Sequence, residues 1–173
     1  MVQERTGVFA AGERQLTLLG PEVKVGDKAP NFTVVGQGMR PLKLEDTKGK
    51  VRILVSVGSL DTGVCSEETQ KFNELAAGLP EDVAILTLSM DLPFAQARWC
   101  GAHNVDKVTT ASDFRDREFG ERYGVRVKET GLLARAVFVV DRDDVVRHVE
   151  YVPQIAQLPN FDGAVNAAKQ AAG

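Results

Sequence analysis

The chain has 173 residues, 43% of them hydrophobic and 26% charged, a composition typical of a soluble globular protein with a full core. Its net charge of −3 is too small to indicate a nucleic-acid or membrane partner, and no segment approaches the roughly 20 apolar residues that cross a bilayer. The first residues lack the apolar stretch of a signal peptide, so we expect one domain over residues 1–173 and a cytoplasmic location.

The first half of the chain predicts a hairpin, a buried strand and a helix. We expect residues 7–20 to form two short strands around a turn at Ala11-Gly12. Residues 51–57, VRILVSV, are almost continuously apolar and β-branched, which is typical of a strand buried on both faces. The segment that follows predicts a helix that ends at Gly78. Its apolar stripe consists of Phe72, Leu75, Ala76 and Leu79.

The second half of the chain predicts further strands and helices. Pro93 suits the first position of a helix and Gly101 suits its end. The run Asp141 to Asp144 is typical of a turn between two strands. In chain order we expect a strand over 83–89, helices over 93–101 and 112–125, strands over 134–140 and 145–151, and a helix over 159–172.

This order of elements indicates an α/β fold. Two buried strands joined by a helix favour a right-handed parallel crossover. The closing pair of strands is antiparallel, which makes the sheet mixed. We therefore predict a thioredoxin-like mixed sheet flanked by helices on both faces, with an N-terminal β-hairpin.

Cys65 lies at the predicted start of a helix, in the segment GSLDTGVC. If Thr62 is the N-cap, Cys65 occupies the third helical position, where a capping box normally has a glutamate. Free backbone N–H groups, the helix dipole and the Thr62 hydroxyl would then all favour the thiolate over the thiol. The alternative is that Cys65 is a small apolar residue that fills the junction between strand and helix.

The second cysteine, Cys100, lies at the end of the helix predicted over 93–101. The negative end of the helix dipole disfavours a thiolate there, so Cys65 is expected to react first. Because 34 residues separate the two cysteines, they do not form a CxxC pair. An inert buried thiol beside Trp99 remains the alternative for Cys100.

Three segments resemble the thiol peroxidases of the atypical two-cysteine peroxiredoxin family: GSLDTGVC, DLPFAQARWCG and GLLARAVFVVD. The resemblance covers nearly the whole chain. It implies that Cys65 is the peroxidatic cysteine and Cys100 the resolving cysteine, which pair in an intramolecular disulfide. Thr62 would orient the peroxide, and Arg135 would be the active-site arginine.

The same resemblance implies a hydroperoxide substrate, often an alkyl or lipid hydroperoxide, with thioredoxin as the reductant. It also implies a homodimer and no metal, haem or flavin. One residue departs from the pattern, because Gly58 stands where the family motif has proline. Glycine adds backbone freedom and leaves one face of the cysteine uncovered, so we expect a slower or more easily overoxidised enzyme.

Other interpretations of the same residues stay open at this stage. Arg135 could simply form an ion pair with a glutamate at the start of a strand. The chain could also be a redox sensor or relay without turnover. His103 and Cys100 alone are too few ligands for zinc. His148 is expected to be exposed on a strand. If an apolar collar surrounds Cys65, Phe94 and Trp99 are the expected members.

Overall fold

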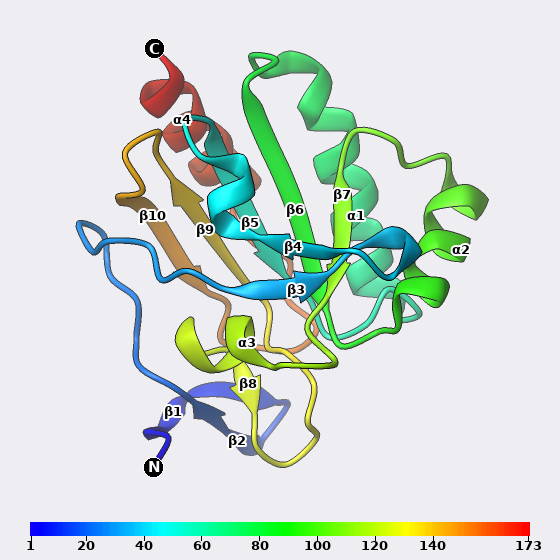
Figure 1. Cartoon of the computed structure of the whole chain (residues 1–173). Helices are drawn as coiled ribbons and strands as arrows, with labels where there is room; N and C mark the ends of the chain where they lie inside the picture. Colours follow the sequence, from blue (N-terminus) through cyan, green and yellow to red (C-terminus); the bar gives the residue numbers. More distant parts are fainter.

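Two β-sheets of unequal size organise the chain in a computed structural model that describes residues 1–173 (Figure 1). The strands are β1 Glu4–Ala11, β2 Arg14–Leu19, β3 Thr33–Val35, β4 Pro41–Lys43, β5 Val51–Ser56, β6 Val83–Ser89, β7 Thr109–Ser112, β8 Arg126–Val127, β9 Ala136–Val140 and β10 Val146–Tyr151. The α-helices are α1 Gly63–Leu75, α2 Pro93–His103, α3 Glu118–Arg122 and α4 Phe161–Ala172. Short 3-10 helices cover Gln37–Met39, Leu44–Thr47 and Ala76–Gly78.

The larger sheet is mixed and has the strand order β10-β9-β5-β6-β7-β3-β4. β5, β6 and β7 run parallel, whereas β9 lies antiparallel to β5 on its other side. The crossover from β5 to β6 contains α1, and the crossover from β6 to β7 contains α2. The predicted thioredoxin-like mixed sheet with flanking helices is therefore confirmed.

Side chains of the central strands alternate between two apolar clusters, one on each face of the sheet. On β5, Ile53 and Val55 face the cluster that contains residues of α1, α2 and α4, while Leu54 faces the opposite cluster. The opposite cluster is closed by α3 and by the N-terminal hairpin. Burial of both faces explains the uninterrupted apolar sequence of β5.

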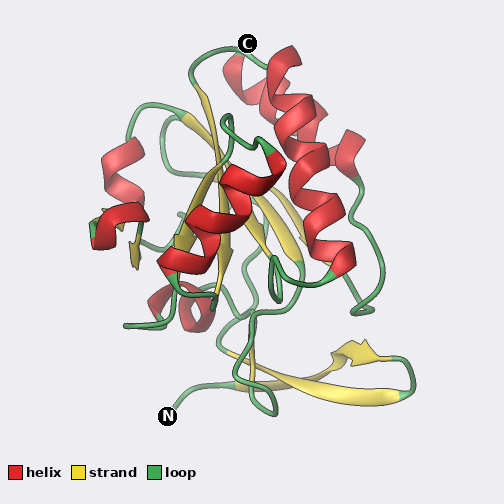
Figure 2. Ribbon diagram, turned by 90° about the vertical axis from the view of Figure 1, so that its right-hand side faces the viewer, coloured by secondary structure: helices red, strands yellow, loops and turns green.

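The predicted N-terminal hairpin is present as β1 and β2, which form the smaller sheet together with β8. The hairpin stands at one end of the molecule, below the main sheet (Figure 2). The Arg5 guanidinium donates to the carbonyl oxygens of Gly20 and Gly124, at 3.0 and 2.6 Å. These bonds fix the hairpin against the chain that leads into β8.

Two helix predictions were wrong in extent. The helix predicted over 112–125 is only α3, because Ser112 ends β7 and Arg117 has a left-handed φ of 57°. Helix α2 continues past Gly101 and ends at His103, and its C-cap residue Asn104 takes the left-handed conformation with φ 55°. Asparagine tolerates that conformation better than most residues, so it can replace glycine as a stop signal.

Several short strands were not predicted. β7 has the sequence TTAS, which lacks the apolar run that marks β5 and β6. β4 and β8 have three and two residues, too few to show a period. The longest helix, α1, has 13 residues, and no helix combines the length and apolar character needed to cross a membrane.

Candidate active site

Cys65 lies in the first turn of α1, at the third helical position, as predicted. Thr62 is the N-cap, but its side chain forms no capping bond, so the predicted capping box is wrong. The Thr62 hydroxyl instead donates to the Ser59 carbonyl oxygen at 2.8 Å. The N–H groups of the first helical turn therefore remain free of side-chain acceptors. Helix geometry aims such groups outward from the helix start, beside the Cys65 side chain.

Arg135 is brought close to Cys65 by the pairing of β9 with β5. It immediately precedes β9, whose first residue, Ala136, pairs with Ser56 at the end of β5. The Ser56 hydroxyl also donates to the Ala134 carbonyl oxygen at 2.7 Å. Because α1 follows β5 after a short loop, the β5–β9 pairing places Arg135 next to the start of α1.

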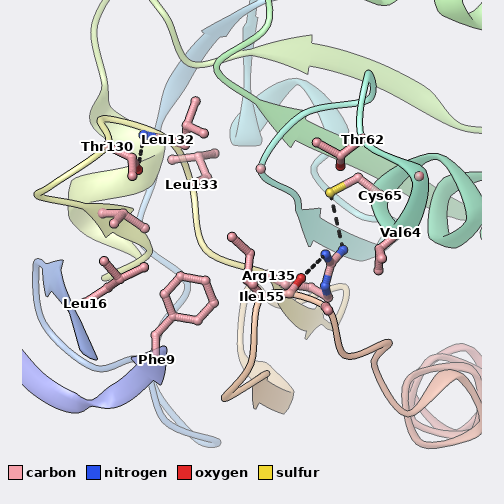
Figure 3. A pocket seen from close by; sticks show the side chains of 14 residues that line it. Phe9, Leu16, Thr62, Val64, Cys65, Thr130, Leu132, Leu133, Arg135 and Ile155 are labelled. Atoms are coloured by element: carbon pink, nitrogen blue, oxygen red, sulfur yellow. Dashed lines mark hydrogen bonds between the residues drawn. The ribbon is translucent and has the colours of Figure 1, made fainter. Parts of the chain in front are cut away.

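The guanidinium of Arg135 contacts the sulfur of Cys65 directly (Figure 3). Its Nη1 lies 3.5 Å from Cys65 Sγ, and its Nη2 donates to the Ile155 carbonyl oxygen at 2.8 Å. Cys65 is only 2% exposed and Arg135 only 4%. Nη1 also forms an ion pair with the buried carboxylate of Glu68. Arg135 thus has the glutamate partner considered above and contacts the cysteine as well.

Glu68 is a site residue that the sequence analysis missed. It lies one turn after Cys65 on the buried face of α1, which also carries Phe72. A charged residue on an apolar helix stripe was the available signal. Burial raises the pKa of the Glu68 carboxyl to about 7, although the Arg135 guanidinium opposes the rise. One of its oxygens, Oε1, has no hydrogen-bond partner.

The raised pKa of Glu68 predicts a loss of stability as pH increases. The folded chain keeps this proton between the ordinary value of 4.5 and about pH 7, where the unfolded chain has released it. Relative to a Glu68→Gln variant, we expect the wild type to lose about 3 kcal/mol of unfolding free energy over this window. Urea unfolding of both chains at pH 4 and pH 8, under reducing conditions, measures the difference. A difference that is independent of pH would contradict the assignment.

A cavity of about 300 Å³ opens above Cys65, and most of its wall is apolar. Thr62 and Arg135 line it too, so the structure brings these three predicted residues together. Hydrophobic wall residues come from the hairpin, from the first turn of α1, from β8 and the segment after it, and from the segment after β10. The apolar wall consists of Phe9, Leu16, Val64, Val127, Leu132, Leu133, Ile155 and Ala156.

The expected collar of Phe94 and Trp99 was wrong. Phe94 is 68% exposed at the start of α2, and Trp99 is packed in the core, where its indole N–H donates to the Ser66 hydroxyl at 3.2 Å. Neither side chain lines the cavity. The hairpin supplies Phe9 and Leu16 instead, and only the tertiary fold brings these residues to the site.

Cys100 lies outside this cavity. It occupies the last turn of α2, belongs to the same apolar cluster as Cys65 and lines a separate surface depression. Both cysteines are free thiols. Burial raises the pKa of the Cys100 thiol, and a contact of 3.7 Å with the Thr110 hydroxyl partly offsets the rise. A raised pKa disfavours the Cys100 thiolate, which agrees with the prediction that Cys65 reacts first.

The two histidines lie apart from the site. His103 stacks on Trp99, and its Nδ1 lies 2.9 Å from the Trp99 carbonyl oxygen. His148 is half-buried rather than exposed, and its Nε2 has no partner, so that prediction was wrong. Burial lowers the pKa of His148. No three His, Cys, Asp or Glu side chains form a group that could hold a metal ion.

Comparisons with known proteins agree with this geometry. Residues 24–166 match the family model described as Redoxin. The chain is 54% identical to the thiol peroxidase of Halalkalibacterium halodurans, over 90% of this chain and 93% of that protein. It is 53% identical to the thiol peroxidase of Bacillus subtilis, over 89% and 92%. The crystal structure of a peroxiredoxin-like protein from Aquifex aeolicus superposes with a TM-score of 0.89, at 44% identity, over 98% of both chains.

Proposed function

The chain belongs to the redoxin family, and from this premise we propose that Cys65 is the residue with which this thiol-dependent peroxidase attacks a hydroperoxide. One observation carries the assignment. A buried arginine, Arg135, contacts the sulfur of a cysteine in the first turn of a helix, inside a cavity. The catalytic roles of Cys65, Thr62, Arg135 and Cys100 are our proposal.

In the first step the Cys65 thiolate attacks one oxygen of the peroxide. A sulfur–oxygen bond forms, the oxygen–oxygen bond breaks, and the second oxygen leaves as an alkoxide or hydroxide that takes up a proton. Cys65 becomes a sulfenic acid. Negative charge moves from sulfur to the departing oxygen, and the Arg135 guanidinium and the helix-start N–H groups are fixed donors beside that path. The Thr62 hydroxyl would orient the peroxide.

In the second step the thiol of Cys100 attacks the Cys65 sulfenic acid. The disulfide forms, the sulfur–oxygen bond breaks, and hydroxide leaves and becomes water with the Cys100 proton. A disulfide requires Cα atoms within about 7 Å. The two cysteines belong to different helices, so the first turn of α1 and the end of α2 are expected to unwind locally. Thioredoxin would then return both thiols by exchange.

The apolar cavity wall favours organic hydroperoxides with hydrophobic groups. Leu132 lines the cavity and is 41% exposed, so Leu132→Thr should leave the fold intact. We expect the KM for cumene hydroperoxide to rise about threefold to tenfold, since part of a leucine-sized apolar contact is lost. The rate with hydrogen peroxide should not change. Steady-state assays of Leu132→Thr and of the remote exposed variant Val25→Thr test this. Equal effects on both substrates would contradict a role in specificity.

Gly58 lines the cavity at the place where the family motif has proline. A Cβ built there would lie 3.7 Å from the Leu133 carbonyl oxygen, an ordinary contact distance. The backbone therefore has room for a side chain, and the glycine leaves this side of the cavity open. A lower rate or easier overoxidation than with the proline of the family motif stays a prediction.

We also propose a homodimer, supported by the exposed apolar side chains of Leu92 and Phe94 at the start of α2, 50% and 68% exposed. Contiguous exposed apolar patches mark interaction surfaces, and Leu92 and Phe94 would form the centre of such a patch. If this surface forms the dimer, Phe94→Glu should shift the sedimentation coefficient to that of a monomer; an unchanged coefficient would contradict it.

The single domain over 1–173 is supported by the packing of Phe9 and Leu16 in the same cluster as Phe138. The cytoplasmic location remains a prediction.

A further inference from the structure

The loop between β5 and α1 is anchored by the carboxylate of Asp91. The Ser59 hydroxyl donates to Asp91 Oδ1 at 2.6 Å, and the Leu60 N–H donates to Oδ2 at 2.8 Å. Ser59 in turn accepts the Thr62 hydroxyl through its carbonyl oxygen. One carboxylate therefore holds the segment that leads directly into the first turn of α1, where Cys65 lies.

The same carboxylate is connected to the helix that carries Cys100. Asp91 Oδ2 also accepts the Ser89 hydroxyl at 2.8 Å. The Ser89 oxygen accepts the Gln96 side-chain amide at 3.0 Å, and that amide also donates to the Ala111 carbonyl oxygen at 2.8 Å. Gln96 lies on α2, one helical turn before Cys100. Ser89 and Gln96 are 0% and 1% exposed, so the bonds of the Gln96 amide to Ser89 and Ala111 are shielded from water, whereas Asp91 is partly buried.

We propose that Asp91 is a positioning residue that controls how readily the Cys65 turn and the Cys100 helix leave their places to form the disulfide. The inference rests on the proposed function. The peroxide step needs the Cys65 turn closed against Arg135, whereas the disulfide step needs both segments to open. A hydrogen-bond network that holds both segments in place should therefore favour the peroxide step and slow the disulfide step.

The chemistry of the carboxylate explains why Asp91 would have this effect. Hydrogen bonds to an ionised oxygen are about twice as strong as neutral ones. Two carboxylate oxygens accept from a backbone N–H and two hydroxyls at once. Asp91→Asn removes the negative charge, and one of the two acceptor positions becomes an NH₂ group that cannot accept a hydrogen bond from the donor it faces. The closed arrangement is then less favourable at nearly unchanged side-chain volume.

The test measures the two steps separately in the full-length chain. Trp99 is the only tryptophan, and it lies beside Cys100 in contact with Ser66, so its fluorescence reports movement of both segments. Stopped-flow fluorescence after one equivalent of hydrogen peroxide, with quench-flow mass spectrometry, resolves sulfenic acid from disulfide. For Asp91→Asn we expect the disulfide step to be about tenfold faster, which corresponds to about 1.4 kcal/mol. The peroxide step should be slower or unchanged, and more peroxide should be needed to overoxidise Cys65.

Ser59→Ala removes one of the hydrogen bonds to Asp91 and should accelerate the disulfide step less than Asp91→Asn does. This variant tests the inference even if Asp91→Asn folds poorly. The double variant should accelerate it by less than the product of the two single effects, because both act through one network. Asp46→Asn is the matched control, since Asp46 accepts the Lys43 N–H at 2.8 Å before the start of β5, at the opposite end from the loop. A disulfide step that is unchanged, or that slows together with the peroxide step, would overturn the inference. Absence of sulfenic acid in the wild type would instead refute the proposed function.

Discussion

Replacement of Cys65 by serine is expected to abolish peroxide turnover, because no other thiol lies in the cavity that Arg135 and the start of α1 enclose. A hydroxyl is a far weaker nucleophile than a thiolate and cannot form a sulfenic acid. The measurement is NADPH consumption with thioredoxin, thioredoxin reductase and hydrogen peroxide.

Cys100→Ser is the informative partner of that variant. It should still consume about one equivalent of peroxide per chain and then stop, because Cys65 is oxidised but no intramolecular disulfide forms. Full turnover of Cys100→Ser with thioredoxin would show that resolution does not use this cysteine. Turnover of Cys65→Ser at the wild-type rate would refute the assignment of Cys65 itself. A sensor without turnover would give one oxidation and no sustained NADPH consumption in the wild type.

Loss of the Arg135 guanidinium is expected to lower the rate of the peroxide step by about 10²–10³-fold, the usual effect of removing a fixed transition-state donor. Arg135 is buried in an ion pair with Glu68, so its removal alone would leave an unpaired buried carboxylate. The double variant Arg135→Met/Glu68→Gln avoids this. The second-order rate with hydrogen peroxide should fall in the double variant and stay near the wild-type value in Glu68→Gln.

Arg135→Lys separates charge from geometry. Lysine keeps the positive charge but lacks the planar group that lets one nitrogen reach Cys65 Sγ while another donates to the Ile155 carbonyl oxygen. We expect an intermediate rate. Arg142→Gln, which removes an exposed arginine paired with Asp82, is the control and should have the wild-type rate. If the double variant reacts as fast as the control, Arg135 is a structural residue only.

The positions of those site residues that depend on local sequence patterns could be predicted from the sequence. Cys65 was predicted at the third helical position because Thr62, a residue type that favours the N-cap, precedes it by three residues, and the structure has it there. The buried strands β5 and β6 were equally clear, since continuous β-branched runs have few other uses. The predicted catalytic roles of Cys65, Thr62, Arg135 and Cys100 still need the variants above.

The rest of the site depends on contacts between distant segments. Glu68 lies on the apolar stripe of α1, but only the fold shows its partner, because Arg135 is 67 residues away in the sequence. Phe9 and Leu16 belong to a hairpin more than 40 residues before Cys65, and no local pattern connects them to the cavity. The Thr62 hydroxyl was expected to cap the helix, but the nearby Ser59 carbonyl oxygen accepts it instead. Helix 112–125 was overpredicted because its charge pattern does not reveal the left-handed Arg117.

The most direct test is the second-order rate constant for the reaction of hydrogen peroxide with Cys65 in the reduced Cys100→Ser chain, compared with free cysteine at the same pH. Because Arg135 and the helix-start N–H groups are fixed beside the sulfur, we expect Cys65 to react about 10³-fold faster or more. A rate constant equal to that of free cysteine would show that these donors do not activate the sulfur.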